Sequence, residues 1–106
     1  RVERAAASVP EAAVCFWAAN EHASRIASHL AEKELRPVVV DNARSKIGTF
    51  HLGFSTPVAR PIPEQLRSRH IIFVLCSPSW NSEIRKQISA MDLRSYEIIP
   101  GVVEEN

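Results

Sequence analysis

Glycine is scarce in this sequence: it occurs three times in 106 residues, and the first is Gly48. The sequence therefore contains no intact glycine-rich phosphate loop and no Gly-x-Ser-x-Gly hydrolase elbow. No apolar run approaches the roughly 20 residues that a membrane-spanning helix needs. The net charge of only +1 gives no general attraction to nucleic acid or to an anionic membrane.

Cysteine is also rare, with only Cys15 and Cys76. Both lie in or beside apolar segments, so we interpret them as reduced core thiols of a cytoplasmic protein rather than as a disulfide framework. The histidines have no partners at the spacing of a metal site, and we expect no metal. These histidines are His22, His29, His51 and His70.

Hydrophobic residues make up 45% of the chain, enough for the core of one domain. We expect residues 1–106 to form a single domain, with a helical lead-in at 1–10 and a loose tail at 102–106. Because the sequence starts at Arg1 rather than at Met, we expect it to be part of a longer protein.

Strand-like and helix-like segments alternate along the chain. Apolar stretches without alternation predict strands that are covered on both faces, and residues repeating at helical spacing predict the helices between them. Strands are predicted at 13–17, 38–41, 70–76 and 96–99, and helices at 21–34 and 80–91. Asn20 is a predicted N-cap of the first of these helices, and Ser79 or Asn81 of the second. This alternation indicates an α/β fold, a Rossmann-like three-layer sandwich with a small, mainly parallel sheet flanked by helices.

Right-handed crossovers would place the ends of the first and third strands side by side. Ligands of such sheets bind beyond the carboxyl ends of the strands, at this switch point. The segments expected to meet there are 17–20, 41–42 and 77–80.

The turn after the first strand corresponds to a dinucleotide-binding fingerprint, but Ala18, Asn20 and Ala23 stand where that fingerprint has glycine. The helix that follows still offers free amides, near Asn20, Glu21 and His22, to a phosphate. Because the glycines are missing, the interpretation we favour here is a retained fold around an empty site.

Asp41 follows the second strand, where a carboxylate would bind a ribose diol. The alternative is a turn-forming aspartate with Asn42 beside it. Arg44 and Lys46 follow and could meet a phosphate. The basic residues between 44 and 70 are more often typical of a solvated loop face, which is the interpretation we favour for them.

Four further residues lie near the expected switch point. Trp17 and Trp80 could stack on a base or sugar ring, or fill the space that a ligand once occupied, and we favour the second interpretation for both. Ser77 and Ser79 lack the surroundings of a hydrolase nucleophile and are interpreted as loop and cap residues.

The segment Trp17-Ala18-Ala19-Asn20-Glu21-His22-Ala23 resembles the motif Trp-Gly-Ala-Gly-Glu-His-Gly. This motif opens small Rossmann-like domains attached to bacterial sugar-modifying enzymes, glycosyltransferases and methyltransferases. Asp41-Asn42 followed by Gly48 and Gly53, then residues 71–80 and 82–88, resemble later parts of the same domains. The resemblance implies an accessory domain whose neighbour carries the chemistry.

Three functions follow as hypotheses. The first is a degenerate accessory or scaffolding domain, not catalytic by itself, that supports a neighbouring catalytic domain or partner protein in sugar or methyl transfer. The second is a working nucleotide-binding module for NAD(H) or a nucleotide sugar, with neither cofactor favoured. The third is self-association as a homodimer through the edge strand at 96–99.

Overall fold

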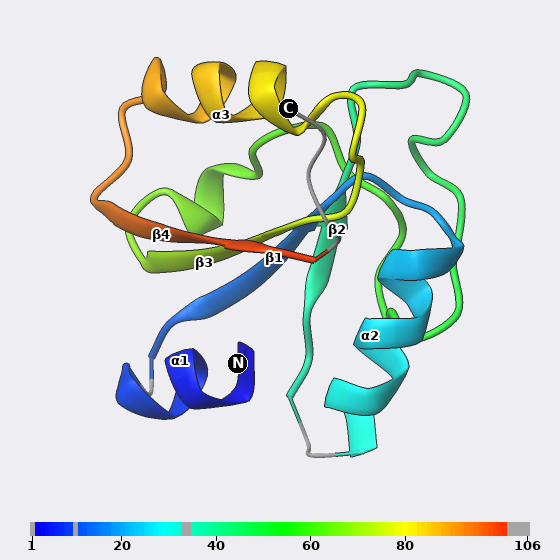
Figure 1. Ribbon diagram of the computed structural model, residues 1–106, viewed down its shortest axis with the longest axis horizontal. Coiled ribbons are helices and arrows are strands. Elements are labelled where there is room, and N and C mark those ends of the chain that lie inside the picture. The colour runs from blue at the N-terminus through cyan, green and yellow to red at the C-terminus, as the bar shows by residue number, and fades with distance from the viewer. Residues whose placement is uncertain (1, 10, 33–34, 102–106) are drawn as a thin grey trace.

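The computed structural model describes residues 2–9, 11–32 and 35–101 (Figure 1). Three α-helices, one short 3-10 helix and four strands follow one another along these residues. In chain order they are α1 (Val2–Ser8), β1 (Ala13–Trp17), α2 (Glu21–Glu32), β2 (Val38–Val40), η1 (Glu64–Leu66), β3 (His70–Leu75), α3 (Asn81–Ser89) and β4 (Ser95–Pro100). The predicted lead-in corresponds to α1, whereas the predicted tail at 102–106 and the helix end at 33–34 lie outside the described residues.

The four strands form one parallel sheet in the order β2-β1-β3-β4. The central strand β1 pairs with both β2 and β3, so that Trp17 lies opposite Val40 on one side and Leu75 on the other. All five residues of β1 are buried, because helices or loops cover both faces of the sheet. The prediction of a small, mainly parallel sheet is confirmed.

Two separate apolar clusters show that the domain has three layers. On one face, α1 and α2 pack on the sheet through residues such as Val2, Ala27 and Leu30. On the other face, α3 and η1 pack through Ile84, Ile88 and Leu66. In Figure 1, α3 lies above the sheet, and α1 and α2 lie below it.

The chain leaves β1 and β3 toward opposite faces of the sheet, because α2 follows β1 and α3 follows β3. Adjacent parallel strands whose connections diverge in this way create a crevice at their carboxyl ends. The predicted switch point between the first and third strands is therefore present.

A long irregular loop, residues 41–63, connects β2 to η1. Ala59 forms a parallel β-bridge with Val40, and this bridge keeps the later part of the loop beside β2. Gly53 lies against the backbone of α2. Its φ is +92°, and a Cβ atom built there would lie 2.7 Å from the Ser28 backbone nitrogen. Only glycine fits this contact without displacing the helix backbone.

The predicted elements are all found, with ends that differ by one or two residues. The prediction that Ser79 or Asn81 caps the second long helix is wrong. Trp80 is the N-cap residue and makes no side-chain capping bond. Asn81 instead lies in the first turn, and its Oδ1 accepts a hydrogen bond from the Ser77 N–H at 3.1 Å, so it fixes the loop rather than the helix.

Candidate functional site

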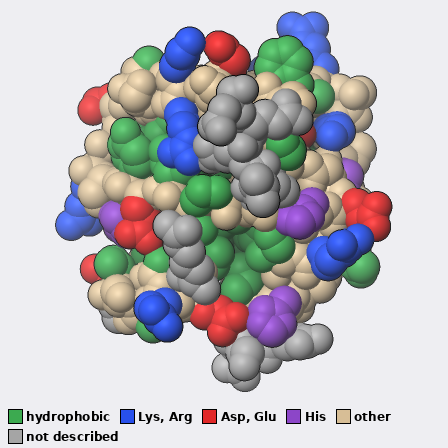
Figure 2. All heavy atoms as spheres, in the orientation of Figure 1, with side chains coloured by type: hydrophobic (Ala, Val, Ile, Leu, Met, Phe, Trp, Pro, Cys, Tyr) green, Lys and Arg blue, Asp and Glu red, His purple; other side chains and the backbone are tan. Residues whose placement is uncertain are grey.

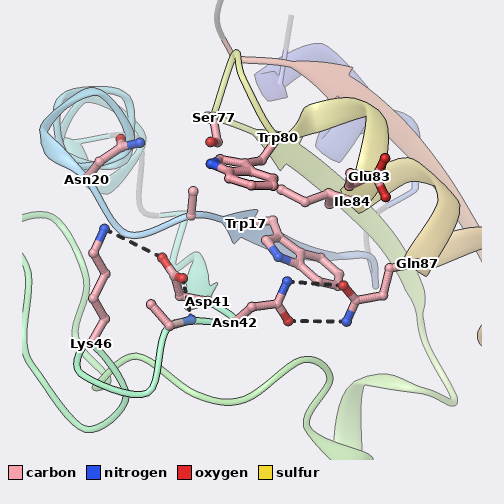
Figure 3. A pocket seen from close by; sticks show the side chains of 12 residues that line it. Trp17, Asn20, Asp41, Asn42, Lys46, Ser77, Trp80, Glu83, Ile84 and Gln87 are labelled. Carbon is pink, nitrogen blue, oxygen red and sulfur yellow. Dashed lines mark hydrogen bonds and ion pairs between the residues drawn. The ribbon is translucent and has the colours of Figure 1, made fainter.

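A cavity of about 600 Å³ lies at the carboxyl ends of β1, β2 and β3 (Figure 3). Its walls come from the turn after β1, the loop after β2, and the loop and first two turns of α3. The lining residues are Trp17, Ala18, Asn20, Asp41, Asn42, Ala43, Lys46, Ser77, Trp80, Glu83, Ile84 and Gln87. The three segments expected from the sequence therefore meet at one hollow of a size that ligand sites commonly have.

Several polar groups of the turn between β1 and α2 bond to protein groups at the edge of the cavity. The Asn20 Oδ1 accepts the Ala23 N–H at 2.9 Å, which confirms the predicted N-cap. The Asn20 Nδ2 donates to the Cys76 carbonyl at 2.8 Å and joins the turn to the end of β3. Ala18 has a φ of +94°, a conformation that favours glycine. Its position is the first glycine of the fingerprint.

Asp41 holds two loops together. Its Oδ2 accepts the Ala19 N–H and its Oδ1 accepts the Ala43 N–H, both at 2.8 Å. The Lys46 Nζ lies 3.8 Å from Oδ2 and donates to the Ala19 carbonyl at 2.7 Å. Since its side chain is only 13% exposed, Asp41 has the contacts of the turn-forming aspartate named above, and little of its carboxylate is left for a ribose diol.

The two tryptophans differ in role. Trp17 is 1% exposed and packs on Phe73 with ring centroids 6.0 Å apart. Its indole nitrogen is buried and has no hydrogen-bond partner among the described residues. Trp80 is 64% exposed and lies at the rim above Trp17 in Figure 3. Trp17 is thus a core residue at the cavity wall, whereas Trp80 offers a free aromatic surface.

The first two turns of α3 add residues that the sequence analysis did not name as site residues. Glu83, Ile84 and Gln87 line the cavity beside Trp80. The side chains of Gln87 and Asn42 donate to each other at 3.1 and 3.2 Å (Figure 3). The signal was available: positions 80, 83, 84 and 87 share one helix face, and that helix begins at the switch point.

Four of the predicted site residues do not line the cavity. Glu21 forms an exposed pair with Arg25 at 3.0 Å. The His22 Nε2 lies 2.7 Å from the Gly101 carbonyl oxygen and donates to it in the tautomer that carries its hydrogen on Nε2. Ser79 is exposed, and Arg44 lines a smaller neighbouring hollow.

The thiols are buried, and the carboxylates that line the cavity have partners. Burial raises the pKa of both Cys15 and Cys76 to about 12, so neither is a thiolate nucleophile near neutral pH. Of the two carboxylates that line the cavity, Asp41 is held by amides and Glu83 pairs with Lys86 at 3.5 Å. The described part of the chain contains no group of three or more His, Cys, Asp or Glu arranged to hold a metal ion.

Two properties of the described surface are relevant to partners. None of the helices in the described ranges has the length and apolar character needed to cross a bilayer. On the face shown in Figure 2, acidic and basic side chains are interspersed rather than gathered into a patch of one sign.

Fold and cavity together define a class: a doubly wound parallel α/β domain with a ligand-sized crevice at its switch point. Comparison with models of known protein families, with curated proteins and with solved structures finds no match.

Proposed function

We propose that this domain is a binding module for a nucleotide-type ligand and carries no chemistry of its own. The observation that supports this most is the cavity of about 600 Å³ at the switch point. Crevices outside the carboxyl ends of parallel strands are where open α/β sheets bind their ligands. The second hypothesis from the sequence, a module for NAD(H) or a nucleotide sugar, is thereby preferred over the first.

The lining groups suit a flat heterocycle with polar edges. The exposed indole of Trp80 is a stacking surface for a base. Asn42 and Gln87 use one donor and one acceptor each on one another, so each amide retains capacity to bind a ligand's polar edge.

The proposed binding mode differs from that of the dinucleotide-binding fingerprint, in which the turn after the first strand contacts the phosphates. The Ala19 and Ala23 amides are already bonded to Asp41 and Asn20, so the turn after β1 holds its place without a phosphate. We propose that the ligand is bound by the loop after β2 and by α3, with the turn as a fixed wall.

The test is ligand binding by wild type and by Trp80→Ala. Thermal unfolding against NAD(H), NADP(H), S-adenosylmethionine and nucleotide sugars should give a shift with one class, because a ligand at 100 times its Kd adds about 2.7 kcal/mol. Trp80→Ala should weaken that ligand about tenfold or more, since base stacking contributes about 1–3 kcal/mol. Phe50→Ala is a matched control, because Phe50 is 72% exposed and does not line the cavity.

The alternative function, a scaffolding domain around an empty site, is favoured by one observation: two amides and one carbonyl of the turn are already bonded to protein side chains. No shift with any ligand of the panel, together with full stability of Trp80→Ala, would contradict the binding proposal and leave this alternative.

A further inference from the structure

A second hollow of about 240 Å³ adjoins the cavity, and Asp41 and Asn42 line both. Its other lining residues are Arg44, Ile47, Arg60 and Pro61. Arg44 and Arg60 come from opposite ends of the loop that follows β2. Both are exposed, and neither forms a hydrogen bond or an ion pair with any residue in the described ranges. Two unpaired guanidinium groups therefore flank a hollow that continues from the candidate site.

The other cation near the cavity is already engaged. The Lys46 Nζ donates to the Ala19 carbonyl and faces the Asp41 carboxylate. The charge of Asp41 is in turn balanced by Lys46 and by two amide donors, so this carboxylate is a weak barrier to an anion nearby. Arg44 and Arg60 therefore carry positive charges near the site that pair with no described residue.

We propose, on the basis of the function proposed above, that the ligand carries a phosphate or diphosphate group bound between Arg44 and Arg60. The base would lie on Trp80 in the main cavity, and the ribose would cross over Asn42. Guanidinium groups bind phosphate oxygens through two parallel N–H donors, which suits a phosphorylated nucleoside better than a neutral one. The phosphate site is thus on the loop after β2 and not at the start of α2.

The experiment compares adenosine, AMP and ADP by calorimetry, with uridine and UDP as a parallel series, on wild type, Arg44→Gln and Arg60→Gln. In wild type the diphosphate should bind at least tenfold more tightly than its nucleoside. Each arginine variant should weaken the diphosphate about tenfold and leave the nucleoside unchanged, because each loses a charge-assisted contact to phosphate.

Arg67→Gln is the matched control, because Arg67 lines a different hollow together with Glu64 and Asp92. It should leave all affinities unchanged. The advantage of ADP over adenosine should also shrink as the salt concentration rises, and it should shrink less in the arginine variants.

Different outcomes separate this proposal from the one on which it rests. Equal binding of nucleoside and diphosphate, or a diphosphate advantage that survives both arginine variants, overturns the phosphate site while the nucleotide-binding function stands. Binding of inorganic pyrophosphate that requires Arg44 and Arg60, without binding of any nucleoside or nucleotide, supports the anion site and overturns the proposed function. Binding of none of these probes overturns both.

Discussion

The turn after β1 and the loop after β2 border the same cavity, but they differ in how their polar groups are satisfied. In the turn, the Ala19 and Ala23 amides have partners within the site. In the loop, Arg44 and Arg60 have none among the described residues and flank an open hollow. The comparison indicates that protein side chains can hold this turn in place although alanine and asparagine occupy the glycine positions of the fingerprint.

Among substitutions that disrupt the turn after β1, Asp41→Ala is expected to have the largest effect. It removes the acceptor of two backbone N–H groups and the partner of Lys46. We expect a loss of about 3 kcal/mol in the free energy of unfolding, since a bond to a charged group contributes about 1.5–3 kcal/mol. Urea unfolding measures it, and Asp41→Asn should recover part of the loss because its amide oxygen still accepts one N–H.

Asp92→Ala is the control for that experiment. Asp92 is exposed, and removal of an exposed carboxylate away from caps and networks changes stability by no more than about 0.5 kcal/mol. If Asp41→Ala were as stable as Asp92→Ala, Asp41 would not hold the turn, and its carboxylate would be free for a ligand.

A smaller effect is expected at Asn20, which both caps α2 and bonds to β3 through the Cys76 carbonyl. Asn20→Ala should cost about 2 kcal/mol, because a lost cap alone costs about 1 and a lost hydrogen bond about 1 more. Asn20→Ser keeps a capping oxygen but cannot donate from the same place, so it should lose only about half. Equal losses for Ala and Ser in chemical unfolding would mean that the cap contributes nothing.

The smallest effect has the opposite sign. Ala18→Gly should stabilise the domain by about 0.5–1 kcal/mol. Residue 18 has a positive φ of +94°, and glycine adopts this conformation with less steric strain than alanine. Ala27→Gly in the buried face of α2 is the control and should destabilise by about 1 kcal/mol. A destabilising Ala18→Gly, seen as a lower Tm, would show that the turn holds alanine without strain.

Much of the fold could be predicted from the sequence. Strands that are buried on both faces of the sheet are continuously apolar, as at 13–17 and 71–75. The Asn20 cap is equally local, since it involves residues three apart. The Asn81 side chain was misassigned because its oxygen can reach either the helix amides or the Ser77 N–H, and sequence does not distinguish between these bonds.

The site was harder to predict than the fold. The partner of Asp41 is Ala19, which lies 22 positions away, and this pairing depends on how two loops approach one another at the end of the sheet. Gln87 shares a helix face with Trp80 and could have been named, but its pairing with Asn42, 45 positions away, could not. Such contacts follow from the assembled sheet and leave no local pattern of their own.

The cavity also has a consequence for the order of events in folding. Its walls come from residues 17–20, 41–46 and 77–87, so no single supersecondary unit contains it. Chain segments this far apart meet late, after loop closure has been achieved. Ligand binding should therefore begin only when β1, β2 and β3 have all joined, and in a refolding experiment it would report the assembly of these three strands.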